Sequence, residues 1–192
     1  MKDIKGTRYE QLLTIIDLVK PKTIIEIGTY DGHNAIRMID QARKHKADIT
    51  YIGYDLFEDM NESIDKEEFN VKPHVDAAVV AERLKNACPG TVITLIKGNT
   101  RETLKNPIRA DLVFVDGGHS RETIANDYAA VKNSSVVVLD DFYLPDNSGA
   151  IPDTSKFGAN FLVWELANAF VLPMEDAVAG GGVVAMAMLV NR

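Results

Sequence analysis

The chain alternates between amphipathic segments and short, continuous apolar runs. Thr7 and Glu10 form a T-x-x-E capping pattern, and apolar residues then recur at helical spacing as far as Pro21, which predicts a first helix over 7–19. Runs without polar alternation are typical of strands buried on both faces of a sheet. Such runs, rich in β-branched residues, lie at 23–28, 49–55, 91–97, 111–116 and 135–140.

Helical patterns separate these runs, at 33–46, at 74–87 and at 120–132 behind Ser120. Because strand and helix alternate, we expect a parallel sheet with right-handed crossovers. The end of the chain differs, since a helix over 157–167 leads into two strands with no helix between them. Such a pair has to be antiparallel. The pattern predicts one α/β domain over 1–192, with a helix in residues 1–20 packed on it.

Two connecting segments are unusually long and polar, at 56–73 and 142–156. Both follow the carboxyl end of a predicted strand, which is where ligands bind in open α/β sheets. We therefore expect both segments to act as lids over a site.

Composition narrows the class of partner. With 192 residues and 46% apolar composition, the chain can bury a sizeable core but is too short for two ordinary domains. Its formal charge of −7 argues against nucleic acid, because phosphate binding needs clustered Lys and Arg. Cys88 has no partner for a disulfide, the charged start lacks an export signal, and the uncharged run 177–191 is too short to span a bilayer. We expect a cytoplasmic protein with a small-molecule substrate, and neither nucleic acid nor membrane as partner.

Two glycines after the first predicted strand mark a sharp turn into a helix. Gly28 and Gly32 follow the spacing G-x-x-x-G, which lets the backbone approach a ligand that the helix N–H groups can bind. A tight turn without a ligand explains this pair equally well. Asp55 ends the second strand, where an acid can accept hydrogen bonds from ribose hydroxyls.

Three further polar residues have both a functional and a structural interpretation. Glu26 lies inside an apolar strand and needs hydrogen-bond donors, which a purely structural network could also supply. Asn99 and Thr100 follow the third strand, where they could receive an adenine edge or simply form a turn.

These residues resemble the E-x-G-x-x-x-G motif and the ribose-binding acid of class I S-adenosylmethionine-dependent methyltransferases, as does the closing hairpin. The resemblance implies a Rossmann-like, seven-stranded, mostly parallel sheet of order 3-2-1-4-5-7-6, with strand 7 antiparallel and helices on both faces. It also implies S-adenosylmethionine as cofactor, with Glu26 near the methionine amino group, Asp55 on the ribose, and Asn99 or Thr100 by the adenine. The other residues that it places along the cofactor are Gly28, Thr29, Tyr30, Gly32, Leu56 and Asp116.

Three acids follow two strands that are expected to be neighbours. Asp116 ends the fourth strand, and Asp140 and Asp141 end the fifth. Carboxylates about 5 Å apart repel by roughly 3 kcal/mol per pair at an effective dielectric near 20. A retained proton or a hard divalent cation would relieve this repulsion, and Mg²⁺ suits such an oxygen cluster. The alternative is that each aspartate has a separate local role, such as capping a helix or anchoring a loop.

The same acids resemble those of small metal-dependent O-methyltransferases of the catechol, caffeoyl-CoA and macrocin types. The resemblance implies that Asp116, Asp140 and Asp141 bind Mg²⁺ or another divalent cation. The chain departs from the catechol type in having Asp-Asp after the fifth strand, and it has Gly118 where relatives often carry a further acid.

His119 is the candidate general base, three residues after the catalytic candidate Asp116. Histidine exchanges protons near neutral pH, so it can take a proton from an acceptor hydroxyl. The alternative is a histidine at a helix start, bonded to backbone.

The expected function is metal-assisted methyl transfer to a hydroxyl oxygen of a small molecule. Three alternatives remain: a non-catalytic module that binds S-adenosylmethionine or its product, a protein of the cephalosporin-hydroxylase-like branch, and a nicotinamide-dependent oxidoreductase. The missing G-x-G-x-x-G and the closing hairpin count against the last of these. The apolar terminal hairpin could support a homodimer, and the acceptor is not evident from the sequence.

Overall fold

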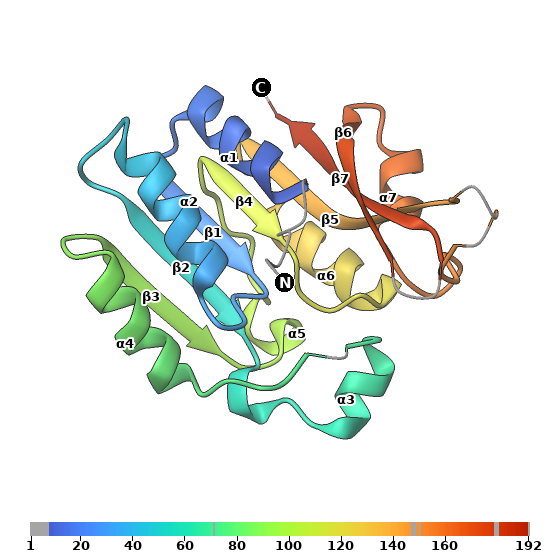
Figure 1. The fold of residues 1–192 in the computed structure, drawn as a ribbon, viewed down its shortest axis with the longest axis horizontal. Helices are drawn as coiled ribbons and strands as arrows, with labels where there is room; N and C mark the ends of the chain where they lie inside the picture. The colour runs from blue at the N-terminus through green and yellow to red at the C-terminus, as the bar shows by residue number, and fades with distance from the viewer. Residues whose placement is uncertain (1–7, 71, 147–148, 150, 179–180, 192) are drawn as a thin grey trace.

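The computed structural model describes residues 8–70, 72–146, 149, 151–178 and 181–191. Its centre is a seven-stranded sheet in the order β3-β2-β1-β4-β5-β7-β6 (Figure 1). β1 to β5 pair in parallel, whereas β7 runs antiparallel to both β5 and β6. The expected sheet order and closing hairpin are therefore confirmed. The strands are β1 (Thr23–Ile27), β2 (Thr50–Asp55), β3 (Val92–Lys97), β4 (Leu112–Val115), β5 (Val136–Leu144), β6 (Ala169–Ala177) and β7 (Val183–Val190).

Helices cover both faces of the sheet, as expected. On one face the core is formed with α1 (Arg8–Val19), α2 (His33–Arg43) and α4 (Ala77–Ala87), and on the other with α6 (Arg121–Val131) and α7 (Asn160–Glu165). Successive strand residues point to opposite faces, so in β4 Leu112 and Phe114 join the first core while Val113 and Val115 join the second. Three short helical turns lie in the connections: η1 (Phe57–Asp59), α3 (Glu62–Glu67) and α5 (Thr100–Thr103). No helix in the described ranges has both the length and the apolar character needed to cross a bilayer.

Two sequence expectations need correction. The run 91–97 is not a strand buried on both faces, because β3 forms the sheet edge and Val92 is 61% exposed. The polar segment 142–156 does not begin as a loop, because β5 continues to Leu144 and its last residues pair with β7. Phe142 and Tyr143 are buried there. Thr7, the expected cap of the first helix, lies outside the described residues.

A bulge interrupts β5 where its parallel neighbour ends. The register between β5 and β7 shifts between Leu139 and Phe142, and Asp141 has a φ of 60°. A positive φ is uncommon for a residue other than glycine, and bulges of this kind redirect side chains, often beside functional sites. The bulge places Asp140 and Asp141 outside the regular alternation of the strand.

Candidate active site

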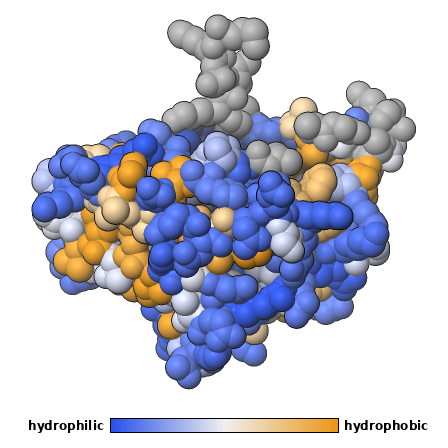
Figure 2. Space-filling model, turned by 90° about the horizontal axis from the view of Figure 1, so that it is seen from below, coloured by the Kyte–Doolittle hydropathy of each residue, from blue (hydrophilic) through white to orange (hydrophobic). Residues whose placement is uncertain are grey.

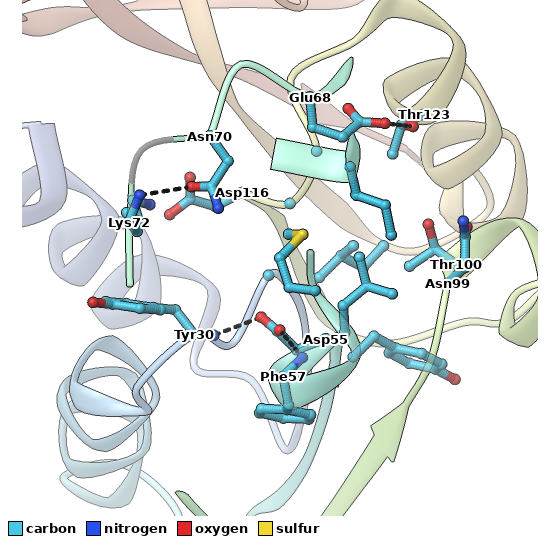
Figure 3. A pocket seen from close by; sticks show the side chains of 18 of the residues that line it. Tyr30, Asp55, Phe57, Glu68, Asn70, Lys72, Asn99, Thr100, Asp116 and Thr123 are labelled. Carbon is cyan, nitrogen blue, oxygen red and sulfur yellow. Dashed lines mark hydrogen bonds between the residues drawn. The ribbon is translucent and has the colours of Figure 1, made fainter. Parts of the chain in front are cut away.

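A pocket opens at the carboxyl ends of β1, β2, β3 and β4 (Figure 3). Its empty volume is about 870 Å³, including the open mouth. The side of the molecule from which α3 projects is mostly hydrophilic, with hydrophobic side chains showing between the polar ones (Figure 2). The pocket lies where the strand order reverses between β1 and β4, the usual position of a ligand in an open α/β sheet.

The turn after β1 brings backbone close to the end of β4. Gly28 has a φ of +93°, and a Cβ on it would lie 2.0 Å from the carbonyl oxygen of Asp116. Only glycine fits this position. Gly32, with a φ of 79°, caps the start of α2. Gly28 and Tyr30 line the pocket, whereas Gly32 and the buried Thr29 are not part of its wall.

Asp55 is held firmly at the end of β2. Its Oδ2 accepts a hydrogen bond from the Tyr30 N–H at 2.7 Å, and its Oδ1 accepts one from the Phe57 N–H at 2.6 Å (Figure 3). Burial nevertheless raises the pKa of this carboxyl. Both Asp55 and the adjacent Leu56 line the pocket, so the carboxylate is oriented before any ligand arrives and keeps lone pairs free to accept hydroxyl donors.

Glu26 lies beneath the pocket rather than in its wall. The side chain is buried in β1 and accepts hydrogen bonds from the Tyr51 hydroxyl and, at 3.0 Å, from Asn34 Nδ2. Burial raises the pKa of Glu26 to about 8. The structural network that the sequence left as an alternative is therefore present, and it ties β1 to β2 and α2.

The turn after β3 forms the far side of the pocket. The Asn99 side chain accepts a hydrogen bond from the Arg101 N–H at 2.9 Å and caps α5. Asn99 and Thr100 both line the pocket, on the side away from Lys72 and Asp116 (Figure 3). Asn99 and Thr100 therefore form the turn that the sequence predicts, and they also line the pocket.

The expected lid after β2 covers the pocket and is attached to α6. Glu68 is buried and accepts hydrogen bonds from the Ser120 N–H at 2.9 Å and the Thr123 hydroxyl at 2.6 Å. Asn70 and Lys72, from the same segment, also line the pocket. Glu68, Asn70 and Lys72 were not singled out in the sequence, where only the length and polarity of their segment marked them.

The acids after β4 and β5 meet side chains from α1. Arg8 contacts Asp140 through its Nε at 2.9 Å and its Nη2 at 3.0 Å, and its Nη1 lies 2.8 Å from Asp176. The Tyr9 hydroxyl donates to Asp116 Oδ2 at 2.8 Å. Burial and the nearby Asp140 carboxylate raise the pKa of Asp116. The helix at the start of the chain thus supplies a cation and a donor for this cluster, and Lys72 is a second cation that lowers the pKa of Asp116.

Asp141 has different partners. Its Oδ2 lies 3.3 Å from His119 Nε2, and its Oδ1 accepts a hydrogen bond from the Tyr143 hydroxyl at 3.2 Å. Burial raises the pKa of Asp141, while the nearby His119 lowers it. The other ring nitrogen of His119, Nδ1, is buried and has no hydrogen-bond partner in the described part of the chain, and the residue lines the pocket.

The Mg²⁺ site expected from Asp116, Asp140 and Asp141 stays a prediction. Both oxygens of Asp140 contact Arg8, whereas Asp116 and Asp141 each accept a hydrogen bond from a tyrosine through one oxygen. Among the described residues no group of three or more His, Cys, Asp or Glu side chains is placed to hold a metal ion.

Comparisons with known proteins find a family that matches the sequence and solved structures that have a similar fold. A family model described as a methyltransferase domain matches residues 25–142. The O-methyltransferase TomG from Streptomyces achromogenes, solved with S-adenosylmethionine, is 17% identical with a TM-score of 0.61, covering 100% of this chain and 84% of that one. The O-methyltransferase from Bacillus cereus, solved with S-adenosylhomocysteine, is 12% identical with a TM-score of 0.63, covering 98% and 83%.

A methyltransferase from Podospora anserina, PaMTH1, is also similar in structure. It was solved with S-adenosylhomocysteine and is 17% identical with a TM-score of 0.53, covering 95% of this chain and 78% of that one. At these identities the likeness concerns the fold. No curated protein matches the sequence.

Proposed function

Because the chain belongs to the family of methyltransferase domains, we propose that it transfers the methyl group of S-adenosylmethionine to a hydroxyl oxygen of a small molecule. The observation that carries the proposal is the pocket at the β1/β4 edge, where the Gly28 turn, Asp55 and Thr100 line one cavity. The similar folds of proteins named O-methyltransferases favour oxygen as the acceptor atom.

The cofactor would extend across the pocket between its two polar ends. Asp55 would accept hydrogen bonds from the ribose, and Leu56 and Tyr30 would pack beside it. Asn99 and Thr100 would face the adenine, so the reacting end would lie toward Asp116. Glu26 would influence cofactor binding indirectly, through its hydrogen bonds with Tyr51 and Asn34. The cofactor supplies a methyl group on a positively charged sulfur.

We propose His119 as the general base. Asp141 holds its Nε2, which leaves Nδ1 without a partner in the described structure. A carboxylate that orients a histidine and stabilises its protonated form is a recurring arrangement in acid–base catalysis. The acceptor hydroxyl would lose its proton to His119 as its oxygen attacks the methyl carbon. The new C–O bond forms as the C–S bond breaks, and the bonding electron pair stays on sulfur.

We also propose that this transfer needs no divalent metal. Arg8 contacts both oxygens of Asp140, where the sequence suggested Mg²⁺, and supplies a permanent positive charge there. Positioning of the two reactants and removal of one proton then provide the catalysis.

Calorimetry and a turnover assay test the proposal together. We expect S-adenosylhomocysteine to bind and NAD not to bind. A panel of phenols, sugars and other hydroxyl compounds should include an acceptor that releases S-adenosylhomocysteine from S-adenosylmethionine. With that acceptor, His119→Ala should lower kcat about 10²- to 10⁴-fold while leaving cofactor affinity unchanged.

Two outcomes would contradict the proposal. Binding of NAD in place of S-adenosylhomocysteine would indicate an oxidoreductase. Tight binding of S-adenosylhomocysteine without transfer to any acceptor would favour a non-catalytic binding module. His45→Ala is the matched control, because His45 lies at the end of α2 and pairs with Asp17 outside the pocket.

A further inference from the structure

Lys72 brings to the pocket a positive charge that the reaction described above does not use. It belongs to the polar segment after β2 and lies in the pocket wall with Tyr30, Asp116 and His119. Among the wall residues that the structure describes, no other is a lysine or an arginine. Lys72 is also exposed, so a molecule that enters through the mouth of the pocket can reach it.

The contacts of Lys72 place its charge at the reacting end of the pocket. Its backbone N–H donates to Asn70 Oδ1 at 3.2 Å, and its Nζ lies 5.6 Å from the centre of the Tyr30 ring (Figure 3). The Asp116 carboxylate raises the pKa of Lys72 against the opposing effect of desolvation, and the acids after β5 raise it further. The amine is therefore charged at neutral pH and is attracted toward the acids after β4 and β5.

The proposed reaction creates negative charge in an acidic part of the pocket. The acceptor oxygen becomes negative as its proton passes to His119, and the same end of the pocket is lined by Asp116. A negative oxygen among carboxylates is unfavourable unless a cation or a hydrogen-bond donor faces it. Arg8 does not line the pocket, and its guanidinium contacts Asp140. Lys72 is the cation of the described wall that can meet this need.

We propose that Lys72 is a catalytic residue, whose ammonium donates a hydrogen bond to the acceptor oxygen and stabilises the negative charge that develops there. This inference rests on the proposed function. The proton passes from the acceptor oxygen to His119 Nδ1, the oxygen forms its bond to the methyl carbon, and the electron pair of the C–S bond stays on sulfur. Lys72 keeps its own protons throughout. Because Lys72 comes from the segment after β2, the expected lid supplies a group for the chemistry as well as covering the pocket.

Turnover of two Lys72 variants tests this role, with the acceptor that the panel above identifies. Lys72→Met keeps an unbranched side chain without the charge, and it should lower kcat about 10²- to 10³-fold. Lys72→Arg keeps the charge and should lower kcat by about tenfold or less. Calorimetry should give the wild-type affinity for S-adenosylhomocysteine in both variants. Lys66→Met is the matched control, because Lys66 lies on α3 in the same segment but outside the pocket wall, and it should keep wild-type turnover.

A second readout separates charge stabilisation from a structural role. A fluorine beside the reacting hydroxyl makes that hydroxyl more acidic and changes its size little. With the fluorinated acceptor, the loss of kcat caused by Lys72→Met should be several times smaller, because a more acidic hydroxyl depends less on a nearby cation. A variant that only disturbs the lid would lose the same factor with both acceptors.

The outcomes separate this inference from the proposed function. An unchanged kcat in Lys72→Met, or the same loss with the two acceptors, would overturn the catalytic role of Lys72. A loss of affinity for S-adenosylhomocysteine as large as the loss of turnover would also overturn it, because Lys72 would then serve the cofactor or the fold. Absence of transfer by the wild-type protein to any acceptor would instead contradict the proposed function.

Discussion

At the scale of single residues, each of the acids at the ends of β4 and β5 has a side-chain partner. Arg8 contacts Asp140, Tyr9 donates to Asp116, and His119 faces Asp141. The Asp140 side chain is 0% exposed. Because removing one partner of a buried pair leaves an uncompensated charge, Arg8 should contribute strongly to stability.

The first residue-scale prediction concerns Arg8 and Mg²⁺. In the wild-type protein, neither EDTA nor millimolar Mg²⁺ should change Tm or turnover, because the carboxylates are already occupied. Arg8→Ala should lose roughly 3–5 kcal/mol of stability. Added Mg²⁺ should restore part of this loss, because a hard cation can neutralise the freed carboxylates. Thermal unfolding with and without Mg²⁺ measures both effects.

Arg37→Ala provides the control for this experiment. Arg37 pairs with the exposed Glu10 of α1, so its loss should cost less than about 1 kcal/mol and should not respond to Mg²⁺. Loss of wild-type activity in EDTA would contradict the metal-free reaction.

How far single residues could be predicted depended on the range of the interaction. Asp55, Thr100 and His119 follow strands directly, and the end of a parallel strand already places a residue at the site. Arg8 lies at the start of a helix, where the amphipathic pattern marks a face but not what that face meets. Its partners Asp140 and Asp176 come from strands distant in the chain, so no local pattern could indicate them.

At the scale of elements, the segment between β2 and α4 closes the pocket through one buried carboxylate. Glu68 accepts hydrogen bonds from Ser120 and Thr123 at the start of α6. This contact joins the lid to α6. The segment also contains the short α3, which has no buried residue, and Phe69, whose ring stacks on that of Phe157. Glu68 is the buried acid that attaches the segment to α6.

We predict that Glu68→Ala speeds the dissociation of S-adenosylhomocysteine at least tenfold, because hydrogen bonds to a charged group each contribute about 1.5–3 kcal/mol. The global unfolding free energy should change less than the dissociation rate, since loops can open without unfolding the core. Stopped-flow displacement gives the rate. Glu67→Ala is the control, because that neighbouring side chain is 55% exposed and forms an ion pair with Arg101. Equal rates in the two variants would show that Glu68 does not hold the lid.

The element boundaries show where periodicity alone was insufficient. The apolar run at 91–97 has the composition of a central strand, yet β3 lies at the sheet edge. Conversely, β5 continues past the polar Asp140 and Asp141 to Leu144, because β7 provides a partner on that side. Both differences arise from the number of neighbours that a strand has, which is a property of the sheet and not of the strand.

At the scale of the whole molecule, the order of the strands creates the site. Alternating strands and helices predict a parallel sheet, and the final hairpin predicts an antiparallel edge, but the order itself came from the family resemblance. In that order the loops after β1 and β4 leave the sheet in different directions. The pocket forms between them, lined by Gly28 on one side and by Asp116 and Gly117 on the other.

In this strand order, both folding and cofactor binding require that the loops after β1 and β4 lie close together. Comparing Gly28→Ala with Gly90→Ala tests this requirement. Both glycines have positive φ, +93° and +82°, but a Cβ at Gly90 meets nothing within 4 Å whereas one at Gly28 meets backbone of Asp116 and Gly117. The backbone penalty, about 1–2 kcal/mol for an L residue, is thus common to both variants. The clash at Gly28 should cost roughly 1–3 kcal/mol more and should separate the two loops that form the pocket.

Urea unfolding should therefore give a lower unfolding free energy for Gly28→Ala than for Gly90→Ala. Only Gly28→Ala should lose affinity for S-adenosylhomocysteine. Equal stability and equal affinity in the two variants would mean that the β1 and β4 loops do not need this contact, and that the pocket does not depend on the order of the sheet.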